Sequence, residues 1–574
     1  MFPRPPWFTG AKLNFAENLL FPTTSPPISP SSIAIIEATE TSRASVTWQS
    51  LRNRVRDCQA GLMAVGVKEN DRVAGYVANH TNALVAMLAA TSLGAIWTAI
   101  SPDTGVTAVL ERLEQIEPAV LFSDNASFYN GKAHPVLAKV KDIAAKLPSL
   151  SAVVVFPTVS SAGMDISEIA AVTKKAFLYP DFTALCTWEP QLKFTQLDPD
   201  HPTYILYSSG TTGAPKCIVH GAIGTLIQHK KEHYLHCSLT PQSTLFYFTT
   251  CTWMMWHWLV SGLASGATLV LYDGSPFRYR GGEEGGESVP DDMAMPRLIE
   301  ELGITHFGTS AKYLSVLEQK SVKPMESLNL STLQAIYSTG SPLAPSTFEY
   351  IYASFPPALN LGSITGGTDI VSLFGAPSSL SPVYVGEIQR AGLGMAIQSW
   401  SPSGENVTDK GEEGDLVAVK AFPCQPVMFW PRGEKGEAKY KASYFETFAE
   451  EGKNVWHHGD YIRFNPSTGG LIMLGRSDGV LKPQGVRFGS AEIYNIVLKH
   501  FAEEVEDALC IGRRRENDTD ETVVLFLKMN AGKKFTDELA KNIKVMIRKE
   551  LSARHVPGVV DECPEIPVTS NGKK

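Results

Sequence analysis

Positions 207–216 carry a run of hydroxyl, glycine and lysine residues with the composition of a phosphate-binding loop. The run, Tyr-Ser-Ser-Gly-Thr-Thr-Gly-Ala-Pro-Lys, lies between two short apolar segments, residues 204–207 and 217–219, which predicts a strand, a loop and a strand. Its glycines let backbone N–H groups approach an anion, its hydroxyls donate hydrogen bonds, and its lysine adds positive charge. We expect a polyphosphate to be bound here by Ser208, Ser209, Gly210, Thr211, Thr212, Gly213 and Lys216.

Two other kinds of segment share this composition. A Walker loop requires Gly-x-x-x-x-Gly-Lys-Ser/Thr, whereas Gly213 lies only three residues after Gly210, so a Walker-type ATPase is disfavoured. A polar surface turn requires only glycine, serine and threonine, and it is the simpler alternative. Residues 207–216 alone do not distinguish a turn from a nucleotide site, so motifs elsewhere in the chain are needed.

The composition restricts the class of protein. The chain has 574 residues, which is long enough for about three to four units, and its 44% hydrophobic content allows a large core. The net charge of −8 gives no reason to expect nucleic-acid binding. Eight scattered cysteines without a C-x-x-C pair indicate neither a zinc site nor a disulfide framework, so we expect a reducing compartment, the cytosol.

Two uncharged stretches, residues 82–100 and 245–272, are long enough to cross a membrane. Both contain glycine, serine and threonine, and no Lys/Arg cluster flanks them to set an orientation. We therefore interpret them as buried helices and strands and expect no membrane span. Residues 1–7 lack the apolar segment of a signal peptide.

Strand and helix patterns alternate through the first ~400 residues, which favours parallel βαβ units in two sheets. We expect the first fifty residues to be irregular, and we expect helices at 48–62 and 107–116 and strands at 71–77 and 268–272. From Gly414 short strands and turns indicate a small β-rich unit. The pattern changes again after Asp478, where we place a domain boundary. The predicted fold class is α/β, with domains 1–477 and 478–574.

Six further motifs follow in order: residues 340–342 (Gly-Ser-Pro), 365–369 (Thr-Gly-Gly-Thr-Asp), 457–460 (His-His-Gly-Asp), 475–478 (Gly-Arg-Ser-Asp), 485–487 (Gly-Val-Arg) and 571–573 (Asn-Gly-Lys). Together with the loop at 207–216 they resemble the adenylate-forming superfamily of acyl-CoA synthetases, adenylation domains and luciferases. The resemblance covers nearly the whole chain. Residues 7–20 are similar to the start of short-chain acyl-CoA synthetases, and residues 366–370 and 485–494 are similar to acetoacetyl-CoA synthetases.

This resemblance implies a large N-terminal domain with two doubly wound αβ subdomains and a small β-rich subdomain. It also implies a small mobile α+β C-terminal domain that rotates at Asp478. The implied substrates are ATP, coenzyme A and a short acid, acetoacetate, with Mg²⁺ as the metal. A carboxylate attacks the α-phosphate, and a thiol then attacks the acyl-adenylate, releasing AMP. Because an anion must approach a polyanion, positive charge and oriented donors are expected to supply most of the catalysis.

The resemblance also implies a role for individual residues. Lys573 bridges the carboxylate and the α-phosphate, Asp369 associates with magnesium, and Thr368 lies beside it on the phosphate. The alternatives without a catalytic role are a disordered terminal lysine for Lys573 and a turn-capping residue for Asp369. For Asp460 and Arg476, expected at the ribose, the alternative is a surface ion pair. The remaining implied nucleotide residues are Gly340, Ser341, Pro342, Ser363, Ile364, Thr365 and Arg487.

The acyl pocket is expected to form from Trp253, Met254, Met255, Thr339 and Gly366. Acetyl-CoA synthetases carry a tryptophan at the position of Gly366, so its absence is expected to leave space for a longer acid such as acetoacetate. Acetate, propionate and butyrate stay physically allowed, as does a truncated form that binds ATP without turnover. His257, inside the aromatic run 253–258, is interpreted as a core histidine.

Overall fold

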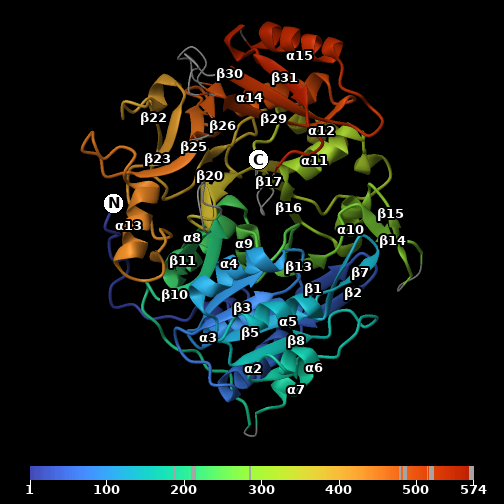
Figure 1. Cartoon of the computed structure of the whole chain (residues 1–574), viewed down its shortest axis with the longest axis vertical. Coiled ribbons are helices and arrows are strands. Elements are labelled where there is room, and N and C mark those ends of the chain that lie inside the picture. Colours follow the sequence, from blue (N-terminus) through green and yellow to red (C-terminus); the bar gives the residue numbers. More distant parts are fainter. Residues whose placement is uncertain are drawn as a thin grey trace.

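The structure is a computed structural model that describes residues 1–567 except 187–188, 209–214, 283–285, 478–479, 482–487, 514, 516–521 and 552. Two large sheets, each with helices on its faces, make up most of the chain, and a smaller unit of helices and strands lies at one end (Figure 1). The predicted α/β class is therefore confirmed.

The first sheet has eight strands, and its central strands are parallel, as the alternating pattern predicted. Helices α2, α3 and α7 pack on one face, and α4, α5 and α6 pack on the other. From edge to edge the strands are β24 (Met428–Trp430), β11 (Lys216–Gly221), β10 (Pro202–Ser208), β4 (Ile96–Ile100), β3 (Arg72–Tyr76), β5 (Val120–Asp124), β8 (Ala152–Phe156) and β9 (Ala176–Leu178). The helices are α2 (Trp48–Ala64), α3 (Thr81–Ser92), α4 (Val106–Ile116), α5 (Leu137–Ala145), α6 (Ser167–Ala170) and α7 (Tyr179–Thr183).

The second sheet has seven strands, and a shared core between the sheets is formed with α1 (Phe15–Leu20), α3, α8 (Ala222–Lys231) and α9 (Met254–Val260). Its outer face is covered by α10 (Ala294–Leu302), α11 (Ala311–Gln319) and α12 (Pro345–Ser354). In order the strands are β18 (Asn360–Ser363), β17 (Ala335–Thr339), β16 (His306–Ser310), β12 (Thr244–Tyr247), β13 (Thr268–Asp273), β1 (Ile33–Thr39) and β2 (Arg43–Thr47).

The expectation that the first fifty residues are irregular is wrong. β1 pairs in parallel with β13, more than 200 residues later in the chain, and β2 returns antiparallel to it. This strand was not predicted because it follows a proline- and serine-rich stretch and its pairing partner is distant in the sequence. No local periodicity indicates such a pairing. The first fifty residues therefore build one edge of the second sheet.

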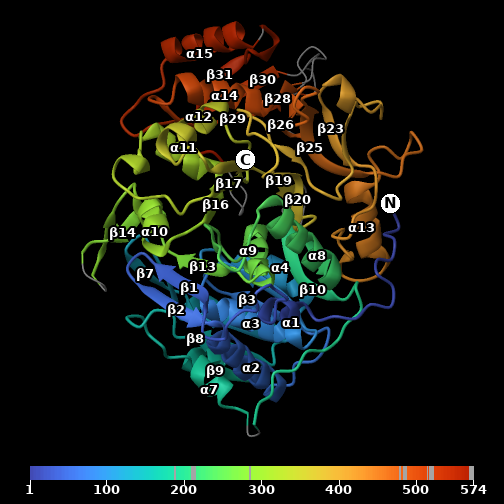
Figure 2. The same ribbon diagram turned by 180° about the vertical axis from the view of Figure 1, so that it is seen from behind.

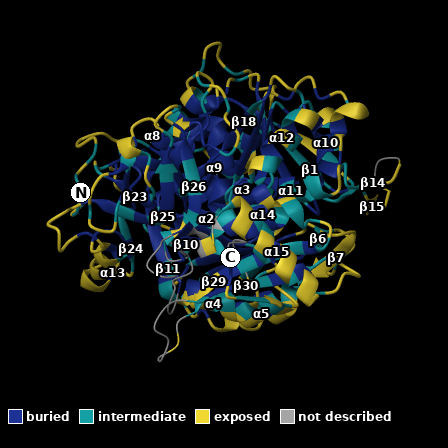
Figure 3. Cartoon of the chain, turned by 90° about the horizontal axis from the view of Figure 1, so that it is seen from above, coloured by how far each residue is buried: buried dark blue, intermediate teal, exposed yellow. Residues whose placement is uncertain are grey.

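Both uncharged stretches lie inside the molecule. Residues 82–100 form most of α3 together with β4, and residues 245–272 run from β12 through α9 to β13, with nearly every side chain buried. In the view coloured by burial, α3 and α9 lie among the dark blue ribbons of the buried interior (Figure 3). Among the described residues, no helix is long and apolar enough to cross a membrane.

The expected small β-rich unit is an antiparallel sheet of β22 (Ile397–Trp400), β23 (Gly414–Ala418), β25 (Trp456–Phe464) and β26 (Leu471–Arg476). Beside it are the strands β19 (Thr365–Gly367), β20 (Ser372–Ala376) and β21 (Arg390–Ala391) and the helix α13 (Glu434–Tyr444). These elements share one core, so this unit holds the hairpin β19–β20 against the helix.

The C-terminal unit is α+β, as predicted. It contains the short pair β27 (Val480–Leu481) and β28 (Phe488–Gly489), α14 (Ser490–His500), α15 (Asp537–Glu550), and a sheet of β29 (Val505–Arg513), β30 (Thr522–Met529) and β31 (Val559–Glu562). It lies beyond α11, α12 and β26 in both side views (Figures 1 and 2). Lys312 of α11 donates a hydrogen bond to the carbonyl oxygen of Glu506 at 3.2 Å. The expected hinge, Asp478, lies outside the described residues.

Buried charges join the two large sheets. His80, which precedes α3, lies 2.7 Å from the Asp124 carboxylate at the end of β5, and Glu37 of β1 accepts a hydrogen bond from the Thr81 amide at 2.8 Å. Burial lowers the pKa of His80, but Asp124, Glu37 and Asp273 together raise it to about 9. His80 thus lies in a buried polar link between strands of both sheets.

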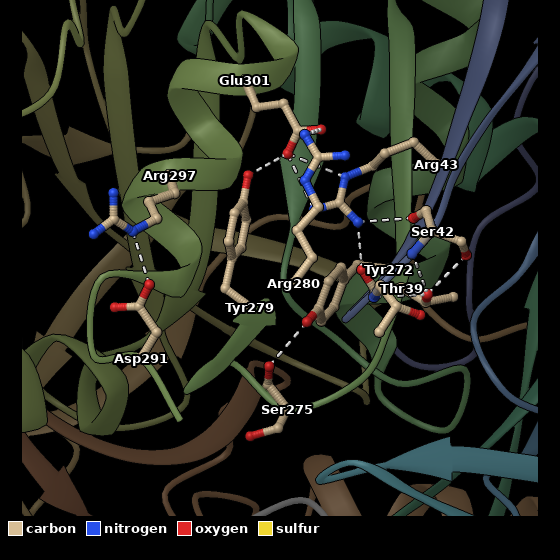
Figure 4. A network of polar contacts seen from close by, with 11 residues as sticks. Thr39, Ser42, Arg43, Tyr272, Ser275, Tyr279, Arg280, Asp291, Arg297 and Glu301 are labelled. Atoms are coloured by element: carbon tan, nitrogen blue, oxygen red, sulfur yellow. Dashed lines mark hydrogen bonds and ion pairs between the residues drawn. The ribbon is translucent and has the colours of Figure 1, made fainter. Parts of the chain in front are cut away.

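A second polar network fastens β2 to the outer helices (Figure 4). The Glu301 carboxylate of α10 accepts from Arg43 Nε and Nη2 at 3.2 and 3.1 Å and lies 3.0 Å from Arg280 Nη2. The hydroxyl of Tyr279 also donates to it. Arg280 and Tyr279 belong to β14 (Arg278–Arg280), which pairs with β15 (Ser288–Pro290), so this network holds the hairpin against the sheet.

Candidate active site

The predicted phosphate loop connects two paired strands. β10 ends at Ser208 and β11 begins at Lys216, and these two residues face each other in antiparallel register. The strand–loop–strand prediction is confirmed for the described residues. Ser209, Gly210, Thr211, Thr212 and Gly213 lie outside them, as do Arg487 and Lys573. The described residues therefore show only where the loop leaves β10 and where it enters β11.

The residues predicted for the nucleotide at 340–342 and 363–365 end or follow two neighbouring parallel strands. Thr339 ends β17, and its hydroxyl donates to the carbonyl oxygen of Ile364, which follows β18, at 2.9 Å. Gly340 has φ +96°, a left-handed conformation that suits glycine, and the Trp253 ring lies 3.6 Å from the position of a Cβ on it. Ser341 and Pro342 continue from Gly340, and Ser363 ends β18. Carboxyl ends of adjacent parallel strands are common ligand sites.

The hairpin β19–β20 carries the Thr-Gly-Gly-Thr-Asp motif. Gly366 pairs with Leu373, and a Cβ on Gly366 would lie 2.1 Å from the carbonyl oxygen of Ser372, closer than any real contact. The space expected from the missing side chain is therefore occupied, in the Cβ direction, by the backbone of β20. A tryptophan at this position requires a different hairpin, so Gly366 is needed for the backbone of this hairpin.

A buried carboxylate supports the same hairpin from behind. Glu232, in the short π-helix η1 (Glu232–His236), accepts from Trp258 Nε1 of α9 at 2.8 Å and from the Ser372 hydroxyl. Its side chain is fully buried. Glu232 thus connects β20 to the helix that begins with Met254 and Met255.

The turn between β19 and β20 is strained. Val371 has φ +49°, which is rare for a β-branched residue. Its carbonyl oxygen accepts from His229 Nε2, and the Ile370 amide donates to the Gly367 carbonyl oxygen at 3.2 Å. Burial lowers the pKa of His229, so a neutral ring holds the turn that contains Thr368 and Asp369.

Asp369 lies where cationic groups converge. Its Oδ1 accepts a hydrogen bond from the Tyr444 hydroxyl at 2.5 Å. Burial raises the pKa of Asp369, but His458, Lys216, the Tyr444 hydrogen bond and Arg476 together bring that pKa below its usual value. The carboxylate is therefore ionised at neutral pH.

Lys216 is one of these cations. Its Nζ lies 5.4 Å from the centroid of the Tyr444 ring and 6.0 Å from that of Phe429, within the range of cation–π contacts. Burial lowers the pKa of Lys216, Asp369 raises it, and Lys439 and Arg476 lower it further, with a net decrease. Lys216 and Asp369 thus both contact one aromatic residue, Tyr444.

The residues predicted for the ribose meet on β25 and β26. Asp460 Oδ1 accepts from Arg476 Nη1 at 3.0 Å, and its Oδ2 accepts from the Thr365 hydroxyl at 3.3 Å. The Asp460 side chain is 8% exposed and that of Arg476 46% exposed, so this ion pair is buried at the carboxylate and exposed at the guanidinium. Gly459 has φ +81°, which lets the Arg476 guanidinium lie against the backbone. Asp460 is thereby joined to the hairpin.

The expected acyl residues are buried in the core between the sheets. Met254 and Met255 begin α9 and are 5% and 3% exposed, and Trp253 precedes them against Gly340. His257, one turn further on, is fully buried, 4.3 Å between ring centroids from Tyr204. Burial lowers its pKa well below the usual value, as in a core histidine, but neither ring nitrogen has a hydrogen-bond partner among the described residues.

The donor set at Asp369 fits a magnesium ion that is held mainly by substrate. Mg²⁺ commonly binds through one or two carboxylates, retained waters and phosphate oxygens. Asp369 offers an ionised carboxylate whose Oδ1 is already oriented, which leaves Oδ2 for a ligand. In the part of the chain that the structure describes, no group of three His, Cys, Asp or Glu residues could hold a metal alone.

Comparisons with known proteins agree with this arrangement. A sequence profile of the family described as AMP-binding enzyme matches residues 28–420. This chain belongs to the AMP-binding enzymes. It is 56% identical to malonamoyl-CoA synthetase of Penicillium aethiopicum, over 100% of this chain and 78% of that protein. It is 48% identical to acetoacetyl-CoA synthetase of Mus musculus, over 99% of this chain and 81% of that protein.

A solved structure extends the similarity to the fold. Acetoacetyl-CoA synthetase from Streptomyces lividans superposes with a TM-score of 0.88 at 38% identity, covering 100% of this chain and 82% of that one. The chain is accordingly an AMP-forming acid–CoA ligase of the acetoacetyl-CoA synthetase-like group. Its substrates are small molecules and include ATP and CoA. The predicted superfamily and enzyme class are confirmed.

Three residues near the Thr-Gly-Gly-Thr-Asp motif were not predicted as site residues. Tyr444 ends a helix that carries none of the ordered motifs, so only its contact with Asp369 reveals it. His458 was given no role, although it contributes to lowering the pKa of Asp369. His220, two positions after Ile218 on β11, is buried, and its pKa is lowered to about 3 by burial, with Asp369 acting in the opposite sense. The alternation of residues 216, 218 and 220 along a strand could have indicated the last of these.

Proposed function

We propose that this AMP-binding enzyme ligates acetoacetate to coenzyme A through an acetoacetyl-adenylate, releasing AMP and pyrophosphate. The observation that carries the proposal is the match to proteins named acetoacetyl-CoA synthetase along 99–100% of the chain, in sequence and in structure. The apolar set Trp253, Met254 and Met255 suits the methyl end of acetoacetate. The Thr339 hydroxyl already donates its proton to Ile364, so it is not the donor for the keto oxygen of acetoacetate.

The chemical difficulty is the approach of one anion to another. We propose that Lys216 and the loop before it hold the phosphates that leave as pyrophosphate, and that Lys573 lies between the acid and the α-phosphate. Asp460 and Arg476 would orient the ribose, so that the α-phosphate lies in line with the carboxylate. Mg²⁺ held by Asp369 would neutralise phosphate charge. The buried carboxylate and ammonium near Tyr444 need no rearrangement when the charges develop.

The carboxylate oxygen forms a bond to the α-phosphorus, and the bond from that phosphorus to the bridging oxygen of pyrophosphate breaks. The thiol of CoA, having lost its proton, then attacks the acyl carbon and expels AMP. We propose that residues 478–574 form the domain that rotates about Asp478 between these two half-reactions. We also propose a cytosolic location, where the buried thiols of Cys58, Cys217, Cys251 and Cys424 stay reduced.

Malonamate is the second candidate acid, because a relative at 56% identity is named malonamoyl-CoA synthetase. Acetoacetate and malonamate share a carboxylate, a methylene and a carbonyl, and differ only in ending with a methyl or an amide nitrogen. The amide donates two hydrogen bonds and requires acceptors, whereas the methyl requires apolar contact. The choice between them is therefore a choice between polar and apolar walls at the far end of the pocket.

Rates with a panel of acids decide the substrate. Purified protein would be assayed with ATP, CoA and acetoacetate, malonamate, butyrate, propionate or acetate, following AMP and CoA thioester. We expect kcat/KM for acetoacetate to exceed that for butyrate at least about tenfold, because butyrate lacks the carbonyl oxygen that the site would hydrogen-bond. A higher kcat/KM for malonamate would replace acetoacetate by the second candidate. Equal or faster turnover of butyrate would contradict both acids.

A further inference from the structure

Tyr444 links an aromatic core to two charged residues of the site. Its ring stacks on that of Trp456, with centroids 3.8 Å apart and planes 14° from parallel, and Trp456 is fully buried. The Tyr444 side chain has one polar atom, the hydroxyl, and that atom donates to Asp369 Oδ1 at 2.5 Å. The residue is 3% exposed, so its ring and its hydroxyl are both immobilised by packing.

The same ring holds Lys216. The Lys216 ammonium lies 5.4 Å from the Tyr444 ring centroid, where the negative face of an aromatic ring attracts a cation. A lysine side chain has many rotamers, and ordering one of them costs conformational entropy. Contact with a fixed ring reduces the number of positions that the ammonium samples before a ligand arrives. Tyr444 thus contacts both charges that flank the proposed phosphate position.

The stack also leads to the ribose residues. Trp456 begins β25, the strand that carries His458 and Asp460, and its indole Nε1 lies 3.4 Å from His458 Nδ1. His458 Nε2 in turn lies 3.7 Å from Asp460 Oδ2. One rigid stack therefore connects α13, which contributes Tyr444, to the strand predicted to bind the ribose.

Tyr440 is a natural control on the same helix. It is one turn before Tyr444 and packs in the same aromatic cluster, 5.4 Å from Tyr444 and 6.4 Å from Trp456 between ring centroids. It is 5% exposed, and its hydroxyl has no hydrogen-bond partner among the residues the structure describes. The two tyrosines therefore share burial and packing and differ in the contact with Asp369.

We propose that Tyr444 is a positioning residue for nucleotide binding. Its hydroxyl holds the Asp369 carboxylate with Oδ2 directed to the metal–phosphate complex, and its ring holds the Lys216 ammonium toward the phosphates. This inference rests on the proposed function, because it assigns Asp369 to the metal and Lys216 to the phosphates. It adds a residue from a helix outside the six ordered motifs.

The test distinguishes the contribution of the Tyr444 hydroxyl to ATP binding from that of its ring. Tyr444→Phe keeps the stack on Trp456 and the face under Lys216, but leaves the carboxylate free to rotate. Calorimetric titration with ATP in the presence of Mg²⁺ is expected to show about tenfold weaker binding, the scale of a lost hydrogen bond to a charged group. Titration with ATP in EDTA is expected to change less than about twofold, since the carboxylate does not contact metal-free phosphate favourably.

Steady-state kinetics and a second variant complete the test. In Tyr444→Phe the KM for ATP is expected to rise while the KM for the acid stays unchanged, a split that a general loss of structure does not produce. Tyr444→Leu also removes the ring, and it is expected to weaken metal-free ATP binding as well. Tyr440→Phe is expected to match wild type in every measurement, with Tm reporting folding for all variants.

Two outcomes overturn the proposal. One is unchanged magnesium-dependent ATP affinity in Tyr444→Phe, and the other is equal losses in Tyr444→Phe and Tyr440→Phe. Failure of the proposed function looks different. In that case wild type forms no CoA thioester from any acid in the panel, while the calorimetric comparison of the variants can still be made.

Discussion

At Asp369 a carboxylate keeps its charge although burial opposes ionisation. Burial alone raises its pKa, and the decrease results from His458, Lys216, Tyr444 and Arg476. Because the folded pKa is depressed, the carboxylate stabilises the fold above the ordinary pKa of an aspartate and loses that contribution as the pH falls through the folded value. A carboxylate that is ionised before a cation binds, as at Asp369, is expected at a metal–nucleotide site.

Gly366 provides a prediction at the same scale. In Gly366→Ala the new Cβ would lie 2.1 Å from the carbonyl oxygen of Ser372, and backbone on a paired strand cannot move aside cheaply. We expect the free energy of unfolding to fall by about 1–3 kcal/mol, the scale of overpacking, and kcat/KM to fall with it. Tm and acid-panel kinetics measure the two effects.

Gly163→Ala is the matched control, because nothing lies within 4 Å of a Cβ at that exposed loop position. It is expected to behave as wild type. Wild-type Tm and kinetics in Gly366→Ala would show that the hairpin adjusts without cost, and that Gly366 does not set the backbone there.

Among the structural elements, the link between the two sheets includes a buried histidine whose pKa is raised. His80 Nε2 bonds Asp124 of one sheet's β5, and its neighbour Thr81 donates its amide to Glu37 of the other sheet's β1. The pKa of His80 is raised to about 9, against an ordinary value of 6.5. The folded state therefore binds more protons than the unfolded state between these two values, so stability falls as the pH rises through that window.

A pH series of thermal unfolding tests this link. We expect Tm to be highest near pH 6.5, the lower end of this window, and to decline toward pH 9, with His80 contributing up to about 3 kcal/mol. Asp273, whose pKa burial and Asp124 raise to about 7, contributes at lower pH. His80→Asn keeps an oxygen that can cap α3 but does not titrate, so its Tm should vary less across the same window. Parallel pH profiles for the two proteins would exclude His80 as the titrating link.

At the scale of the whole molecule, local patterns predicted more than distant pairings did. The face of Leu51, Val55, Cys58 and Leu62 predicted α2 because the helical period lies in adjacent residues. β1 was missed because its partner is β13, and strand pairing over that distance leaves no local periodicity. The ordered motifs led to Asp369, Asp460 and Arg476, which the structure brings to neighbouring elements. Tyr444 was missed because it meets Asp369 across 75 residues and belongs to no motif.

Two predicted site residues or segments, the loop at 207–216 and Lys573, are far apart in the sequence. The predicted phosphate loop connects two strands of the first sheet, whereas Lys573 is near the other end of the sequence, outside the described residues. We propose that adenylation requires both, so the reaction depends on how the C-terminal unit meets the large domain. The Lys312 contact with Glu506 is one place where these parts touch.

Acetoacetate labelled with oxygen-18 in its carboxylate tests the adenylate directly. Attack of the carboxylate on the α-phosphorus leaves a labelled oxygen bonded to that phosphorus, and thiol attack on the acyl carbon then releases it in AMP. Mass spectrometry of the nucleotide products, with ATP, CoA and labelled acid, should find label in AMP, none in pyrophosphate, and AMP equal in amount to acetoacetyl-CoA. Unlabelled AMP, or ADP with labelled inorganic phosphate, would contradict an acetoacetyl-adenylate intermediate.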